Sequence, residues 1–160
     1  MVDMLRARRR GFFRREYEVY ADDTPVTVLT GARREGCEFT LSGAGFRVDR
    51  DGRRHFLLTG PDGRIATADR QSGREWTVRT AGGELTLAKP SIWRSDWEVR
   101  GAASGAIRQE GWFSRTYSAD VPPDVPLPVA VFVLYVVLVI FERQASAAAG
   151  GAAAASAASG

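Results

Sequence analysis

The stretch that most constrains the fold is Val129–Phe141, thirteen residues without a charged side chain. A helix that is apolar on every face must be buried in protein or in lipid. As a helix the run is roughly 20 Å long, whereas the hydrocarbon core of a bilayer is ~30 Å thick. Several prolines precede the run within residues 122–128, and proline is tolerated in the first turn of a helix but not in its interior. The run therefore predicts a buried helix that begins at these prolines.

Two other interpretations of this run stay open. Extended upstream to Pro126, the apolar stretch is still shorter than the ~20 residues of a usual membrane span, and no tryptophan flanks it as an interfacial anchor. The valine content also fits a strand, but buried strands usually have only about four to eight residues. A buried helix is therefore preferred to a membrane segment, and a membrane segment is preferred to a long strand.

The length and composition of the whole chain predict one globular domain. It has 160 residues, of which 44% are hydrophobic and 26% charged, and these are ordinary values for a soluble domain. Its single cysteine, Cys37, cannot form an internal disulfide. Residues 1–15 lack the apolar core of a signal peptide. A cytoplasmic location is expected.

From Glu16 onward the sequence alternates with period two, as strands do. In the first such segment Tyr17 and Val19 alternate with glutamates, and turn sequences such as DRDGR (49–53) and GPDGR (60–64) separate the later segments. The segments number about eleven, at spacings of about eight to twelve residues, which indicates a sandwich or a barrel.

Together the strands and the apolar run predict the architecture. A closed sheet of about twelve strands has an interior too wide for its own side chains to fill, and only the run at 129–141 is apolar all round. We therefore predict a mainly β fold, a closed antiparallel barrel of about twelve strands around a central hydrophobic C-terminal helix. The predicted helix spans residues 128–143, and its expected core contacts are Val129, Phe132, Val133, Val136, Val137 and Ile140.

The two ends of the chain are expected to lie outside this barrel, which is assigned residues 12–144. Residues 1–11 are interpreted as a basic arm. Residues 145–160 contain only Ala, Gly and Ser, have no face to bury, and are predicted to be a disordered tail.

The order of short strands, a proline-rich link and an apolar helix also resembles a known family. The strands lead to ADVPPDVPLP, and the apolar helix that follows ends in FER. With the Pro122-Pro123-Asp124 motif and the segment GAIRQEGWFSR at 105–115, residues 12–143 resemble the LURP-one-related family, which belongs with tubby C-terminal domains and phospholipid scramblases. The resemblance implies a twelve-stranded barrel around a central helix.

The resemblance does not identify a ligand for this chain. Scramblases have several acids before the helix that are proposed to bind calcium, but here only Asp120 and Asp124 occupy that region. Because calcium needs about six to eight oxygen ligands, no metal is expected. Tubby domains bind phosphoinositide headgroups through basic residues outside the barrel, and no position here matches them residue by residue.

The one electrostatic signal is at the N-terminus, where residues 1–15 carry a net charge of +5 and the remainder −2. A basic cluster beside apolar residues suits an anionic membrane surface, although a solvated arm is the simpler interpretation and nucleic acid is a less favoured partner. The candidate binding residues are Arg6, Arg8, Arg9, Arg10, Phe12, Phe13, Arg14 and Arg15.

No catalytic or cofactor-binding motif is present. His55, the only histidine, has no His, Cys or carboxylate partner near it in the sequence, and Cys37 suits a small core residue. The sequence therefore predicts a non-enzymatic barrel, without cofactor, which binds an anionic membrane surface peripherally through its basic N-terminal residues. Any protein partner is unidentified. The alternative is a tail-anchored membrane protein whose cytoplasmic β-domain is held by residues 129–141.

Overall fold

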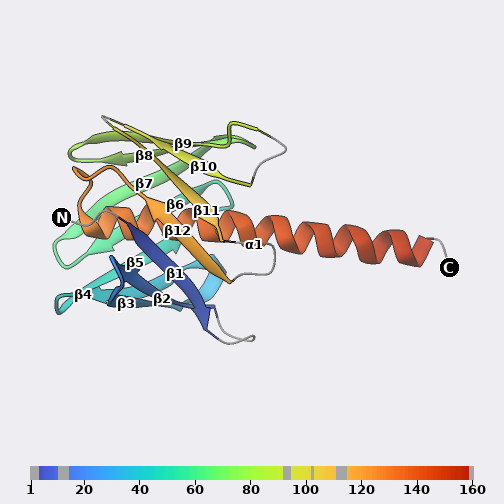
Figure 1. Ribbon diagram of the computed structural model, residues 1–160, viewed down its shortest axis with the longest axis horizontal. Helices are drawn as coiled ribbons and strands as arrows, with labels where there is room; N and C mark the ends of the chain where they lie inside the picture. Colours follow the sequence, from blue (N-terminus) through green and yellow to red (C-terminus); the bar gives the residue numbers. More distant parts are fainter. Residues whose placement is uncertain (1–3, 11–14, 92–94, 102, 111–114, 159–160) are drawn as a thin grey trace.

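The computed structural model describes residues 4–10, 15–91, 95–101, 103–110 and 115–158, except for the side chains of Arg33 and residues 151–158. The described chain has twelve strands, a short 3₁₀ helix, η1 (Arg33–Glu35), and one long helix (Figure 1). The strands are β1 (Leu5–Arg10), β2 (Glu16–Ala21), β3 (Thr24–Gly31), β4 (Cys37–Leu41), β5 (Ala44–Arg50), β6 (His55–Gly60), β7 (Gly63–Ser72), β8 (Glu75–Thr80), β9 (Gly83–Ala88), β10 (Trp97–Arg100), β11 (Ser104–Gln109) and β12 (Thr116–Asp120).

The strands form a closed barrel in which each is antiparallel to its neighbours in the sequence. The ring closes where β1 pairs with β12, with Leu5 opposite Ala119 and Arg8 opposite Thr116. Within a strand the side chains alternate between the two faces of the wall. In β2, for example, Tyr17 and Val19 are buried while Glu18 between them is only half-buried. The predicted barrel is therefore confirmed.

The helix α1 (Leu127–Ala158) runs through the ring of strands and continues beyond it (Figure 1). Every residue from Val129 to Phe141 is buried, with at most 8% of its surface exposed. The six predicted core residues of the helix are among them, and they pack with inward side chains of the strands in one cluster. The central helix is therefore confirmed.

The helix begins at Leu127, among the prolines at which its start was predicted, with Pro128 in its first turn. The amide of Ala130 donates to the carbonyl of Pro126 at 2.9 Å, which is the first hydrogen bond of the helix. By length and composition Leu127–Gly150 is apolar enough to cross a bilayer, but 72% of its most apolar window is buried inside the protein. The core helix of a soluble protein has the same properties.

At both ends of the chain the structure differs from the prediction. Residues 5–10 of the predicted arm form β1, which pairs with β2 and β12. Leu5 and Ala7 alternate with arginines and are fully buried, so β1 contributes an apolar face to the barrel despite its four arginines. The predicted disordered tail is helical as far as Ala158, because a helix already formed in the barrel can extend through alanine, the strongest helix former.

Candidate functional site

A groove on the outer wall brings together arginines of β1 and the arginine that directly precedes β12, at the place where these two strands close the barrel. Its volume is about 700 Å³, and Arg6, Arg8 and Arg9 of β1 line it with Arg115. We call it the arginine groove. The remaining lining residues are Tyr20, Asp23, Glu110 and Thr116. With four arginines and two acids, the lining has a net charge of +2.

The register of β1 on β12 explains why this surface is hollow. Arg6 lies opposite Ser118 and Arg8 lies opposite Thr116. The outward side chains of β12 are thus short and those of its neighbour are long. Thr116 lines the groove, and Ser118, two residues further along the strand, is only 8% exposed. The arrangement is a shallow groove edged by guanidinium groups.

Acidic neighbours offset part of the positive charge. Nη1 of Arg6 lies 3.6 Å from Oδ1 of Asp23, and Nε of Arg6 lies 3.6 Å from Oε1 of Glu110. Nε of Arg10 lies 3.1 Å from Oε1 of Glu18. Arg8 is exposed and makes no ion pair with any residue that the structure describes. The Nε of Arg9 is buried and has no hydrogen-bond partner in the described part of the chain. Arg8 is therefore the guanidinium group most open to an added anion. The side chain of Arg9 instead follows Leu5 and Ala7 toward the inner face of β1, and it also lines the cavity beside Glu142.

The structure divides the predicted basic patch. Arg6, Arg8 and Arg9 meet in the arginine groove, and Arg10 lies beside it on the same strand. Arg15 instead lies at the end of the barrel where α1 emerges. Phe12, Phe13 and Arg14 lie outside the described residues, so their insertion into a bilayer stays a prediction.

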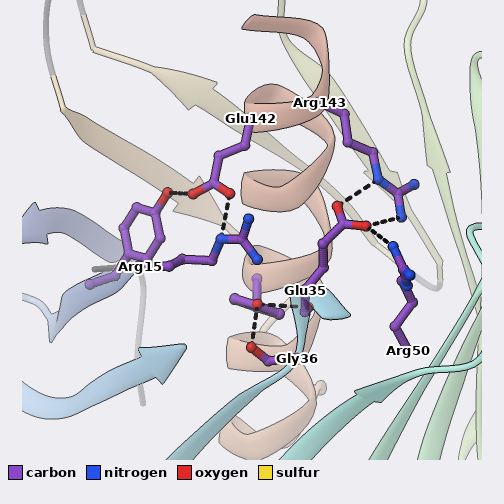
Figure 2. Close-up of polar contacts among 8 residues, drawn as sticks. Arg15, Glu35, Gly36, Arg50, Glu142 and Arg143 are labelled. Carbon is purple, nitrogen blue, oxygen red and sulfur yellow. Dashed lines mark hydrogen bonds and ion pairs between the residues drawn. The ribbon is translucent and has the colours of Figure 1, made fainter. Parts of the chain in front are cut away.

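A second polar cluster surrounds α1 where it leaves the barrel (Figure 2). It consists of Arg15, Tyr17, Glu35, Arg50, Glu142 and Arg143, and we call it the helix collar. On one side of α1, Glu142 accepts a hydrogen bond from the hydroxyl of Tyr17 and pairs with the Nε of Arg15 at 2.6 Å. These contacts join the end of the apolar run to β2 and the residue that precedes it.

On the other side of α1, Glu35 binds two arginines (Figure 2). It accepts from Nε and Nη2 of Arg143, at 2.8 and 3.0 Å, and from Arg50. Nη1 of Arg143 also donates to the carbonyl of Arg53 at 2.9 Å. The collar thus links α1 to η1 (Arg33–Glu35), to the last residue of β5 and to the turn after it.

Tyr135 supports the collar from inside the barrel. This fully buried residue donates through its hydroxyl to the carbonyls of Glu35 and Gly36, at 2.8 and 2.9 Å. Arg34 and Glu35 have positive φ angles of 55° and 62°, a conformation that costs energy for residues other than glycine. The hydrogen bonds of Tyr135 hold this turn against the helix.

Burial and ion pairing shift several pKa values in the collar. Burial alone would raise the pKa of Glu35, but hydrogen bonds and charge from Arg143 and Arg50 outweigh it and lower the pKa. The pKa of Tyr17 is raised by burial and by the neighbouring Glu142 carboxylate. Glu35 is therefore held charged and the Tyr17 phenol neutral. These are the protonation states in which Glu35 accepts from the two arginines and Tyr17 donates to Glu142.

The residues considered for catalysis have structural surroundings. The barrel register places Asp69 opposite His55, with Nδ1 and Oδ1 2.6 Å apart, a partner that sequence proximity did not reveal. Cys37 is fully buried as predicted, and burial raises the pKa of its thiol. Among the described residues no three His, Cys, Asp or Glu side chains converge. No protein-family model, curated protein or solved structure matches this chain.

Proposed function

We propose that this protein is a non-enzymatic barrel that binds anionic membrane surfaces peripherally, through the arginine groove. The observation that carries the proposal is the gathering of Arg6, Arg8, Arg9 and Arg115 around one groove of about 700 Å³. Phosphate oxygens are strong acceptors for guanidinium groups, so a phosphate-bearing headgroup is a suitable occupant. A cytoplasmic location is part of this proposal.

We also propose kinship with the LURP-one-related, tubby and scramblase barrels. Its support is the architecture that the resemblance implies, twelve antiparallel strands closed around a C-terminal apolar helix. The proposed binding surface is nevertheless argued from this chain's own arginines. The scramblase acids are represented only by Asp120 and Asp124, so neither calcium binding nor lipid scrambling is proposed.

The expected affinity of the groove is modest. Each basic residue near an anionic bilayer contributes ~1 kcal/mol, and Asp23 and Glu110 offset part of the charge of Arg6. The attraction is screened within ~8 Å at physiological ionic strength. Binding should therefore depend strongly on salt and on the fraction of anionic lipid.

Co-sedimentation of the full chain with vesicles tests this proposal. The protein should be retained by phosphatidylserine vesicles and not by neutral phosphatidylcholine vesicles. Replacing Arg6 and Arg8 by alanine removes two exposed charges from β1 and should weaken binding by up to about 30-fold. The matched control is Arg64→Ala with Arg79→Ala, two exposed arginines of β7 and β8 on the opposite side of the strand ring.

Three results would reject the proposal. They are equal retention on neutral vesicles, no retention on acidic vesicles at low salt, and equal losses in the two double variants. A DNA duplex added as competitor separates lipid binding from nonspecific polyanion binding, which also weakens with salt. Vesicle retention that persists at high salt and in both variants would favour the tail-anchored alternative.

A further inference from the structure

The barrel wall has one seam where neighbouring strands are barely paired. Between β3 and β4 only Thr30–Glu38 and Gly31–Cys37 are paired. On their other edges both strands are paired along their length, β3 with β2 back to Thr24 and β4 with β5 out to Leu41. Within the described chain, residues 24–29 therefore have no ladder partner on the β4 side. We call this stretch the open edge of β3.

The helix collar explains why the two strands meet at one end and part at the other. Close to the collar, the amide of Gly31 donates to the carbonyl of Arg15 at 2.7 Å. The amide of Ala32 donates to the carbonyl of Gly36 at 2.8 Å. A Cβ at Gly31 would lie only 2.7 Å from the Arg15 oxygen, so glycine is required for this approach. The turn is thus fixed at the collar, and the ladder ends two residue pairs away from it.

A groove of about 690 Å³ lies on the outer wall at this seam. Its lining residues include Phe39 and Phe46, whose rings are stacked with their centroids 5.2 Å apart. Val28 of the open edge also lines it and is 36% exposed, one of only two large hydrophobic side chains exposed among the described residues. The other lining residues are Thr27, Thr30, Glu38, Thr40, Gly45, Arg47, Thr59 and Gly60. Four of the lining residues are threonines, which suit pairing with another strand.

The charges in this groove favour a basic occupant. Glu38 is exposed, and its carboxylate has no hydrogen bond or ion pair with any residue that the structure describes. Arg47 lies opposite it in the register, but its Nε donates to Asp49 at 2.9 Å. Glu38 therefore remains available to a cation brought by a ligand.

We propose that this seam binds an extended, basic segment of a partner protein by strand addition. The backbone of the segment pairs with the open edge of β3, a β-branched side chain contacts Val28, and a lysine or arginine faces Glu38. Unpaired strand edges recruit extended peptides because the edge offers a row of unused N–H and C=O groups. An anionic lipid surface does not suit this groove, since it would face the Glu38 carboxylate.

Peptide binding to the full chain tests the proposal. The probe is a fluorescein-labelled peptide of alternating valine and lysine, whose affinity is measured by fluorescence polarisation. A valine–glutamate peptide should bind more weakly, because it places carboxylates near Glu38. A valine–lysine peptide with N-methyl groups on alternate amides should lose about tenfold or more in affinity, since several backbone hydrogen bonds are removed.

The variant Glu38→Gln locates the site. It should weaken binding of the valine–lysine peptide by about two- to fivefold, the effect of one exposed ion pair. The matched control is Glu84→Gln on β9, where the glutamate is 59% exposed and pairs with Arg79 on the outer wall. That variant should leave peptide binding unchanged.

Amide hydrogen exchange gives an independent measurement. In the free protein, amides in the open edge of β3 should exchange faster than those of β7, which is paired on both sides, and the valine–lysine peptide should slow them. The proposal is overturned if no peptide binds, if N-methylation has no effect, if Glu38→Gln and Glu84→Gln act alike, or if the open edge is already as protected as β7.

Discussion

Replacing Glu35 by glutamine tests whether the helix collar stabilises the barrel. Glutamine keeps the volume of the side chain and removes its charge. In the native protein Glu35 accepts from Arg50 and Arg143, and the three side chains are only 15%, 22% and 19% exposed. After the substitution the two guanidinium groups face a neutral amide whose NH₂ group cannot accept from them.

The magnitude follows from these contacts. Hydrogen bonds to charged groups are worth about 1.5–3 kcal/mol each, and removing one partner of a buried pair costs about 3–5 kcal/mol. Both arginines are partly exposed and can recover some hydration, so the lower part of this range applies. We expect Glu35→Gln to lower the free energy of unfolding by about 2–3 kcal/mol at pH 7.

Urea unfolding of the two proteins across pH measures this loss and its origin. The folded-state pKa of Glu35 is lowered relative to an unfolded value near ~4.3. The contribution of Glu35 is therefore complete above that unfolded value and is lost as pH falls through the lower folded-state pKa. The difference between wild type and Glu35→Gln should be constant from about pH 7 to pH 5 and should shrink at more acidic pH.

The matched control is Glu84→Gln, which removes a glutamate whose pair with Arg79 is 59% exposed on both sides. Such exposed pairs contribute about 0–1 kcal/mol. Equal losses of stability in the two variants, or a difference from wild type that does not change with pH, would show that the collar is only a surface ion-pair cluster.

Three further predictions concern the central helix. Val136→Asp places an unpaired carboxylate at a fully buried position and should abolish cooperative folding; an unchanged melting temperature would contradict the central position of the helix. Deleting residues 126–160 should leave an insoluble or molten chain, whereas a cooperative melt of residues 1–125 would mean that the barrel does not need its helix. Truncation after Gln144 removes no buried side chain among residues 145–150, so the melting temperature should change by less than about 1 °C, as measured by circular dichroism.

The sequence predicted those parts of the fold whose signals are local. The thirteen apolar residues at 129–141 and the alternation in segments such as Glu16–Ala21 were sufficient for a barrel around a helix. β1 was missed because its arginines hid the alternation of Leu5 with Ala7. The helical extension to Ala158 was missed because the prediction considered only whether the tail has an apolar face to bury. The helix propensity of alanine is enough to continue a helix that is already formed.

The candidate site was less predictable because its parts are distant in the sequence. Arg6, Arg8 and Arg9 form a local cluster and were found, but Arg115 reaches the same groove only because β12 closes the ring onto β1. The collar joins Glu35 to Arg143. Its one local signal was the pair Glu142-Arg143 directly after the apolar run, because charged residues there must find partners where the helix leaves the core.

The position of α1 at the end of the strand sequence has a consequence for synthesis of the protein. All twelve strands are made before the segment that fills them, and the ring closes only when Leu5 meets Ala119. At about 5–20 residues per second the ribosome needs roughly one to four seconds to pass from the end of β12 to Phe141. Because a hollow apolar ring is unstable in water, the nascent strands must wait unfolded during that interval. We therefore expect the barrel to form only after α1 has been made, and the emerging chain to be a client of chaperones that shield apolar strands.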